Sequence, residues 1–304
     1  MSPTEALRAA GLDVAAVDAL IAATLAEDLR DGVDVTSVAT VPEDQVATLD
    51  LTARAAGVVA GIPVAARVFE VESGGRTRVE MVRSDGDRVL PGDVVVTLSG
   101  RTRSLLVCER TALNLLCHLS GVATATAAWA DALAGTRARV RDTRKTTPGL
   151  RVLEKYAVRC GGGVNHRMGL WDAALVKDNH VVAAGGVAAA FDAVRTRFPG
   201  VPVEVEVDSL AQLAEVVDAG ADLVLLDNFT PAQTAEAVEL VSGRSELESS
   251  GGLTLEVARA YAETGVDYLG LSFVRSSEHV RRIKSQLVGT TIKVVAKVET
   301  AEAV

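Results

Sequence analysis

The sequence predicts an α/β protein: an N-terminal α+β sandwich-like domain, residues 1–115, followed by an open or incomplete β/α barrel, residues 116–304. Three observations predict this architecture. From about residue 137, short β-branched runs alternate with helical patterns, polar residues follow most of these runs, and glycine and proline punctuate the earlier runs. Continuous apolar strands that alternate with helices are typical of a parallel sheet covered by helices.

The N-terminal domain is predicted from one helical pattern and two turn-rich stretches. Residues 12–29 have the pattern of an amphipathic helix. Residues 58–73 and 86–106 suggest antiparallel strands punctuated by glycine and proline. Residues 109–133 are then predicted to form a helix that leads into the barrel.

Seven short runs are predicted as barrel strands, and helical patterns separate most of them. Five landmarks near their ends, Lys177, Glu206, Asp227, Ser250 and Ser272, are separated by 29, 21, 23 and 22 positions, which suits repeating β/α units. The runs are residues 138–143, 172–179, 201–208, 221–228, 246–250, 265–272 and 292–299.

Charge is unevenly distributed along the chain. The net charge of −9 argues against a general nucleic-acid or anionic-membrane surface, because both require a basic face. Residues 137–177 nevertheless contain ten cations and only three acids. Part of this charge is expected on a solvated helix face, since Arg151, Lys155 and Arg159 are spaced by four. The remaining cations need another explanation.

Polar residues at the predicted strand ends can explain the remaining cations. Arg144 and Lys145 follow one run, and Lys177, Glu206 and Asp227 follow three others. The carboxyl ends of barrel strands meet at one mouth, where active sites lie, although routine strand-end polarity gives the same pattern. Arginine grips carboxylate or phosphate with two hydrogen bonds, and lysine is a compact charge, so several of each predict a polyanionic ligand. Glu206 and Asp227 could hold Mg²⁺ together with substrate phosphates, or could be counterions to the lysines.

Two glycine-containing segments could let a ligand approach the backbone. Residues 160–169 present His166 and Arg167 beside a glycine run, although many such runs are simply turns. Ser250 and Gly251 precede a helical pattern. Amides and hydroxyls there could bind phosphate, or Ser250 could merely lie near the helix cap.

The cysteines and the N-terminal sequence indicate in which cellular compartment the protein is expected. Three scattered cysteines without a CxxC pair favour packed thiols in a reducing compartment. The first twenty residues contain no basic leader followed by an apolar run, and no stretch reaches the roughly 18 apolar residues of a membrane span. We therefore expect a cytoplasmic protein.

Long motifs in the chain resemble one enzyme family. The segment "RDTRKTTPGLRVLEKYAVRCGGGVNHRMGLWDAALVKDNH", with "ERTALNLLCHLSGVAT", "VEVEVDS", "LLDNF" and "LESSGG", closely resembles quinolinate phosphoribosyltransferase, also called carboxylating nicotinate-nucleotide pyrophosphorylase. The similarity covers about residues 13–269. It implies the type II phosphoribosyltransferase architecture.

The resemblance also implies a reaction and its site residues. The family joins quinolinate to phosphoribosyl pyrophosphate with Mg²⁺ and releases pyrophosphate and CO₂, which gives nicotinate mononucleotide for NAD synthesis. By resemblance, Lys145, Lys177, Glu206 and Asp227 are catalytic, and Glu206 and Asp227 hold the metal. The substrate-binding positions that the resemblance implies are Arg110, donated across the interface of a homodimer, and Thr143, Arg144, His166, Arg167, Ser250, Gly251 and Ser272.

The end of the chain departs from the family after about residue 269. It resembles a pyruvate kinase barrel segment, in which Lys297 and Glu299 match a lysine and a glutamate that serve phosphoryl transfer and metal binding. We expect this tail to be a strand-helix-strand unit that comes from another protein. Its Phe273 could crowd the phosphate site beside Ser272. The alternatives to an active transferase are a catalytically impaired anion-binding chimera, a Schiff-base enzyme that uses Lys177, and a kinase.

Overall fold

The computed structural model describes residues 1–30, 32–271 and 292–297, and these form two compact units. Unit 1 contains residues 1–124 and 152–161 with the strand at 292–297, and unit 2 contains residues 125–151 and 162–271. The boundary that the sequence predicted, between residues 115 and 116, lies inside the long helix α5 (Thr102–Ala132). Among the described residues, no helix combines the length and the apolar character that a membrane crossing needs.

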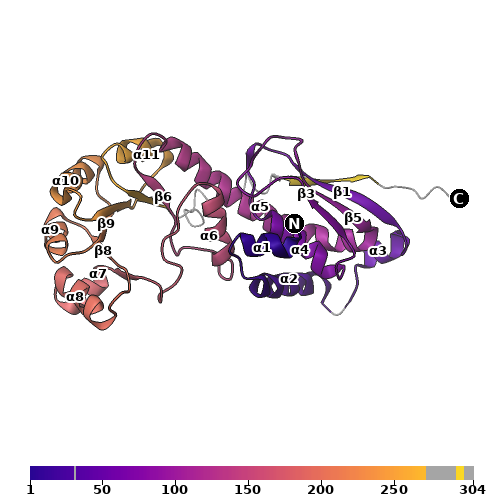
Figure 1. Ribbon diagram of the computed structural model, residues 1–304, viewed down its shortest axis with the longest axis horizontal. Coiled ribbons are helices and arrows are strands. Elements are labelled where there is room, and N and C mark those ends of the chain that lie inside the picture. Colours follow the sequence, from indigo (N-terminus) through magenta and orange to yellow (C-terminus); the bar gives the residue numbers. More distant parts are fainter. Residues whose placement is uncertain (31, 272–291, 298–304) are drawn as a thin grey trace. The chain divides into compact units, whose positions relative to one another are not determined.

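Unit 1 is built on a four-stranded antiparallel sheet (Figure 1). The strand order is β12-β1-β5-β3, formed by Ile292–Lys297, Val46–Ala53, Val94–Arg101 and Arg78–Met81. A two-stranded ribbon pairs β2 (Gly57–Val58) with β4 (Arg88–Val89). The helices, besides the first part of α5, are α1 (Pro3–Ala9), α2 (Val14–Leu29), α3 (Val35–Thr40), α4 (Ile62–Glu72) and most of α6 (Arg151–Cys160).

Helix α4 lies where the sequence predicted a strand, so that prediction was wrong. Gly61 precedes the helix with φ of +93°, and the Asp85 carboxylate accepts hydrogen bonds from the backbone N–H groups of Gly61 and Ile62, each at 2.9 Å. Most residues from Ile62 to Phe69 are buried. A helix that is buried on nearly all sides has the same continuous apolar run as a buried strand, so periodicity alone does not separate the two.

Helix α6 is not the solvated face that the spacing of its cations predicted. Lys155 is only 1% exposed, and of the three cations only Arg159 is exposed. The helix packs in unit 1, where the Tyr156 hydroxyl donates to Asp85 Oδ2 at 2.7 Å. Some of the cations in this segment are therefore buried within unit 1, and others belong to the candidate site described below.

Strand β12 contains most of the run that the sequence predicted as the last barrel strand. It instead pairs antiparallel with β1, with Lys297 opposite Thr48, and completes one edge of the unit 1 sheet. Backbone groups of an edge strand can pair with any extended segment, so a β-branched run alone does not reveal its sheet. Ser272, Phe273 and Glu299 lie outside the described residues. The resemblance of this tail to pyruvate kinase stays a prediction.

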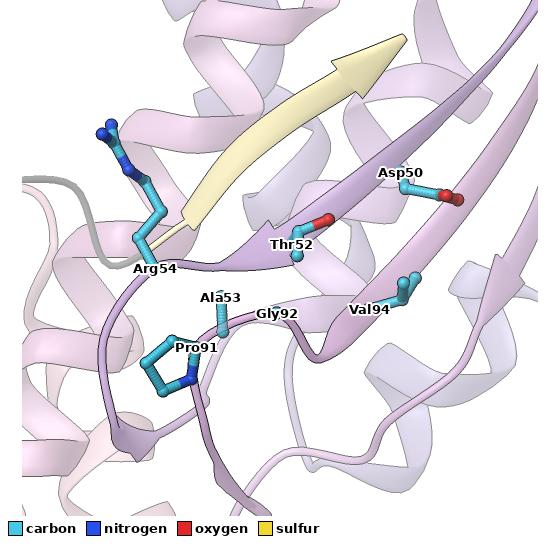
Figure 2. A pocket seen from close by; sticks show the side chains of 7 residues that line it. All are labelled: Asp50, Thr52, Ala53, Arg54, Pro91, Gly92 and Val94. Atoms are coloured by element: carbon cyan, nitrogen blue, oxygen red, sulfur yellow. The ribbon is translucent and has the colours of Figure 1, made fainter. Parts of the chain in front are cut away.

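A pocket of about 460 Å³ lies along β1 and the turn before β5 (Figure 2). Among the described residues that line it, Arg54 is the one cation, and none is a site residue predicted from the sequence. It is lined by Asp50, Thr52, Ala53, Arg54, Pro91, Gly92 and Val94.

Unit 2 is a six-stranded parallel sheet, which confirms the predicted α/β class. The strand order is β6-β11-β10-β9-β8-β7, formed by Arg139–Arg141, Tyr268–Gly270, Glu246–Ser250, Leu223–Asp227, Val203–Val207 and Ala174–Val176. Five helices follow the strands: α7 (Asp178–Ala184), α8 (Val187–Arg197), α9 (Leu210–Asp218), α10 (Pro231–Val241) and α11 (Leu255–Ala262). Within the described residues β6 and β7 are the sheet edges, as in an open barrel.

The strand register determines which side chains share a face of this sheet. Glu206 is paired with Leu225, Leu225 with Glu248, and Glu248 with Tyr268. Paired positions of parallel strands project to the same face, and side chains alternate along each strand. One face therefore carries acids at alternate positions of β8 and β10, while Val205, Val207, Val224, Leu226 and Leu247 form a buried layer on the other.

Candidate active site

The turn after β6 holds Arg144 and Lys145. The Lys145 N–H donates to Thr143 Oγ1 at 3.1 Å, and the Thr146 N–H donates to the Arg144 carbonyl at 3.0 Å. Lys145 is exposed, whereas Arg144 is half-buried and its Nε is a buried donor without a hydrogen-bond partner among the described residues. The turn thus fixes two cations directly after a strand.

The glycine-rich segment is attached to the edge of β6. The Val164 N–H donates to the Val140 carbonyl at 2.8 Å, and the Asp142 N–H donates to the Val164 carbonyl at 3.1 Å. The buried Asp142 carboxylate accepts hydrogen bonds from the Asn165 side-chain amide and from the His166 N–H, each at 2.7 Å. These bonds hold the segment before Arg167 next to the Arg144 turn.

The guanidinium groups of Arg167 and Arg144 interact unfavourably. Arg167 donates from Nη1 to the Ala173 carbonyl at 3.0 Å, but its Nε is also buried without a partner in the described structure. Burial and the positive charge of Arg144 lower the pKa of Arg167. Two neighbouring cations with unsatisfied buried donors are stabilised by an anion placed between them.

Lys177, Glu206 and Asp227 lie at the ends of three consecutive strands of the sheet. Lys177 directly follows β7 and forms an ion pair with Glu206 of β8, with 44% of the lysine side chain and 17% of the glutamate side chain exposed. Asp227 ends β9 and accepts a hydrogen bond from its neighbour Asn228 at 2.8 Å. The two carboxylates are half-buried, so both remain accessible to a ligand.

Ser250 and Gly251 form a fixed turn beside Asp227. Ser250 of β10 is paired with Asp227 in the sheet, and its carbonyl accepts from the Asn228 N–H at 2.9 Å. Gly251 has φ of +92°, and a Cβ on it would lie 2.2 Å from Asn228 Oδ1. Glycine is therefore required here by both conformation and space.

The structure thus places most of the predicted site residues at the carboxyl ends of the parallel strands. Thr143, Arg144 and Lys145 lie after β6, and the others lie on or directly after β7 to β10 or in the attached glycine-rich segment. Arg110 is exposed on α5 in unit 1, and Ser272 lies outside the described residues. We call Arg144, Lys145, Lys177, Glu206 and Asp227 the strand-end ring.

Sequence reasoning named His166 as a substrate-binding position but missed the charges around it deeper in the same sheet, Arg141, Glu204 and Glu248. Arg141 donates from Nη1 to Glu248 at 2.7 Å and to Glu204 at 3.4 Å, and His166 Nε2 lies 2.6 Å from Glu204 Oε2. We call these four residues the inner cluster. Its signal in the sequence was the alternation of charged with apolar residues inside "RVR", "VEVEV" and "ELESS", because a charge within a buried strand needs a partner.

Two groups of residues could be considered for a metal ion. The carboxylates of Glu206 and Asp227 are hard oxygen donors, which fit Mg²⁺ bound together with substrate phosphates. His166, Glu204 and Glu248 also offer ligand atoms within 4.8 Å of one another. The guanidinium of Arg141 already contacts both carboxylates of that second group, so the strand-end carboxylates fit a cation better.

Comparison with known proteins decides the family. The model of the quinolinate phosphoribosyl transferase C-terminal domain matches residues 122–284, and that of the N-terminal domain matches residues 34–120. The chain belongs to the quinolinate phosphoribosyltransferase family. The resemblance inferred from the sequence is thus confirmed, and the match extends past residue 269 to residue 284.

Individual members of this family align with most of the chain. The carboxylating nicotinate-nucleotide pyrophosphorylase of Mycobacterium leprae is 52% identical over 260 residues, which cover 84% of this chain and 92% of that protein. The crystal structure of NadC from Streptococcus pyogenes is 39% identical, with a TM-score of 0.84, and covers 94% of this chain and 97% of that one. The Francisella tularensis nicotinate-nucleotide pyrophosphorylase structure is 34% identical, with a TM-score of 0.85, and the match covers 95% and 98% of the two chains.

Proposed function

We propose that this member of the quinolinate phosphoribosyltransferase family transfers the phosphoribosyl group of phosphoribosyl pyrophosphate to quinolinate. The products are nicotinate mononucleotide, pyrophosphate and CO₂. The observation that carries the proposal is the pair of Arg144 and Arg167, two close cations with buried, unsatisfied donors at the carboxyl end of the parallel sheet. Quinolinate has two adjacent carboxylates, so it can supply acceptors to both guanidinium groups.

The two substrates divide the site residues between them. Arg144, Arg167 and Lys177 bind quinolinate with Thr143, and a second copy of the chain donates Arg110 in a homodimer. Lys145 binds the phosphoribosyl donor, and Ser250 and Gly251 hold its phosphate with a hydroxyl and a backbone N–H. The exposed Lys145 and the fixed Ser250–Gly251 turn support this division.

Glu206 and Asp227 would hold Mg²⁺, which when bound neutralises charge on the departing pyrophosphate. The carboxylates themselves stabilise the positive charge that develops on the ribosyl carbon as pyrophosphate leaves. The quinolinate nitrogen then forms the new bond to that carbon. When CO₂ departs, the electron pair of the broken bond stays on the ring carbon, where the neighbouring positive nitrogen stabilises it, and a proton from water then takes the place of CO₂.

The contribution of the chain is mainly alignment. Fixed cations hold two anions that would otherwise repel each other, and correct placement of two reactants can lower a barrier by about 7–11 kcal/mol. No covalent bond to the protein is needed. We also propose a cytoplasmic location, which the three free thiols support.

The test is product formation by the purified full chain. Incubation with quinolinate, phosphoribosyl pyrophosphate and Mg²⁺ should give nicotinate mononucleotide and CO₂ in equal amounts, and nicotinate should not replace quinolinate. Arg167→Ala should abolish most of this activity, while Arg195→Ala, at an exposed arginine of α8 paired with Asp192, should not. Quinolinate binding without product would favour the anion-binding chimera, and borohydride trapping of a carbonyl substrate on Lys177 would favour the Schiff-base alternative.

A further inference from the structure

The imidazole of His166 is enclosed by protein atoms. The residue is 7% exposed, and the Arg167 N–H donates to its Nδ1 at 2.6 Å. Its Nε2 lies 2.6 Å from Glu204 Oε2. Both ring nitrogens are therefore occupied within the chain, and neither is presented to a substrate carboxylate.

These contacts determine where the ring carries its proton. A backbone N–H can only donate, so Nδ1 must provide a lone pair, and the proton of the neutral ring lies on Nε2. An unprotonated Nε2 so close to a carboxylate oxygen would be repelled by it, which leads to the same assignment. The contact with Glu204 is electrostatic rather than an aligned hydrogen bond, because Glu204 Oε2 has no hydrogen-bond donor among the described residues.

Arg141 holds Glu204 in place. It bridges Glu204 and Glu248, which are 3% and 1% exposed, and its guanidinium lies 5.0 Å from the centre of the Tyr268 ring. Gly270 provides the space for this arrangement, since a Cβ there would lie 2.2 Å from Glu248 Oε1. Burial and the nearby Glu204 raise the pKa of Glu248 to about 8, against the opposing effect of Arg141. Arg141 is thus held between two buried carboxyl groups.

We propose that Arg141, Glu204 and Glu248 are positioning residues, which fix His166 as the Nε2–H tautomer so that its Nδ1 orients the backbone N–H of Arg167. His166 then acts on quinolinate through Arg167 rather than by gripping a carboxylate, as the family resemblance implied. Asp142 completes the arrangement by holding the His166 backbone. The role in quinolinate binding rests on the proposed function, whereas the tautomer does not.

The tautomer can be measured on the free full-length protein. In a ¹⁵N-labelled sample at neutral pH, the His166 ring should show a proton on Nε2 and none on Nδ1, with the signals assigned by their loss in His166→Asn. A proton on Nδ1, alone or together with one on Nε2, would overturn the proposal. Because no substrate is present, this result is independent of whether the chain forms nicotinate mononucleotide.

The positioning role is tested by a matched pair of variants. His166→Asn keeps a side-chain acceptor near the position of Nδ1, whereas His166→Leu removes it. We expect His166→Leu to weaken quinolinate binding about tenfold, as for loss of one hydrogen bond, and His166→Asn to recover most of the loss. Binding of phosphoribosyl pyrophosphate with Mg²⁺ should change little in either variant.

The same measurements of quinolinate binding can also contradict the positioning role. Equal loss of quinolinate binding in both variants, with normal thermal unfolding, would mean that the imidazole itself grips the substrate. If His166→Leu does not fold, the tautomer of the unaltered protein still decides the proposal. A wild-type chain that binds quinolinate but forms no product would remove the proposed reaction and leave the positioning role standing.

Discussion

The inner cluster and the strand-end ring are built from the same kinds of residue on the same sheet, yet they differ in how their charges are balanced. In the inner cluster Arg141 contacts both acids, and Glu204 and Glu248 are almost fully buried. In the strand-end ring Lys145 is exposed and Arg144 has a buried donor without a partner in the described structure. Buried charges within the strands therefore stabilise the fold, whereas the less buried charges at the strand ends are available to bind a ligand.

The physical reason is desolvation. A buried charge loses its hydration, so it must be paired inside the protein, and removing one partner leaves an uncompensated charge. A charge at the strand end keeps part of its hydration and can exchange it for a substrate. This difference leads to four predictions, and each of them can contradict or refine it.

The largest effect is expected on activity, from Arg167 of the glycine-rich segment, which is repelled by Arg144 of the strand-end ring. Arg167→Ala should lower kcat/KM for quinolinate by about 10²–10³, the loss typical of one preorganised charge-stabilising group. It should not lower the free energy of unfolding, because it relieves repulsion with Arg144. Steady-state kinetics with denaturant unfolding check both parts. If the variant lost stability in proportion to activity, the distinction between the two regions would fail.

The next effect is expected on stability from the inner cluster. Arg141→Met should lower the free energy of unfolding by about 3–5 kcal/mol, because the buried carboxyl groups of Glu204 and Glu248 lose the guanidinium that they share. The matched control is Arg137→Met, which removes a partner of Asp267 from a pair whose arginine is 66% exposed. That change should cost at most about 1 kcal/mol. Similar costs in urea unfolding would contradict the comparison.

A smaller effect is expected from Gly251→Ala at the predicted phosphate turn. A residue with a Cβ in this left-handed conformation costs about 1–2 kcal/mol. Gly243→Ala is the control, since Gly243 has φ of +77° but nothing within 4 Å of its Cβ position. Only Gly251→Ala should also weaken binding of phosphoribosyl pyrophosphate, because only it displaces Asn228. Unchanged affinity in both variants would remove the turn from the site.

The last effect is expected in the pH dependence of stability. The pKa of Glu248 is raised from 4.5 to about 8, so its contribution to stability is complete below about pH 4.5 and is lost as the pH rises through about 8. Glu248→Gln lacks this titration. The Tm of the wild type should therefore fall relative to that of Glu248→Gln between pH 5 and pH 9. Parallel curves would show that Glu248 does not change its protonation in this range.

The sequence alone predicted that the residues of the strand-end ring lie at strand ends, because spacing and polarity are local properties. Runs that end in Lys177, Glu206 and Asp227 recur at the pitch of β/α units, and the structure places these residues at the ends of β7, β8 and β9. Their roles in catalysis still rest on the family.

The contacts of the inner cluster and two elements were not predicted, because they depend on tertiary structure. Nothing near Arg141 in the sequence indicates that its partners are Glu204 and Glu248, more than sixty residues away. Helix α4 has the apolar run of a strand, and its start is fixed by the distant Asp85. The pairing of β12 with β1 joins opposite ends of the chain. Local pattern carries no information on such pairings.

The most direct test of the account is a crystal structure of the protein with quinolinate bound. We expect its two carboxylates within hydrogen-bonding distance of the Arg144 and Arg167 guanidinium groups, with the contacts among Arg141, Glu204 and Glu248 unchanged. Quinolinate bound elsewhere, or bound by the His166 ring after it has left Glu204, would contradict the assignment of ligand binding to the strand ends.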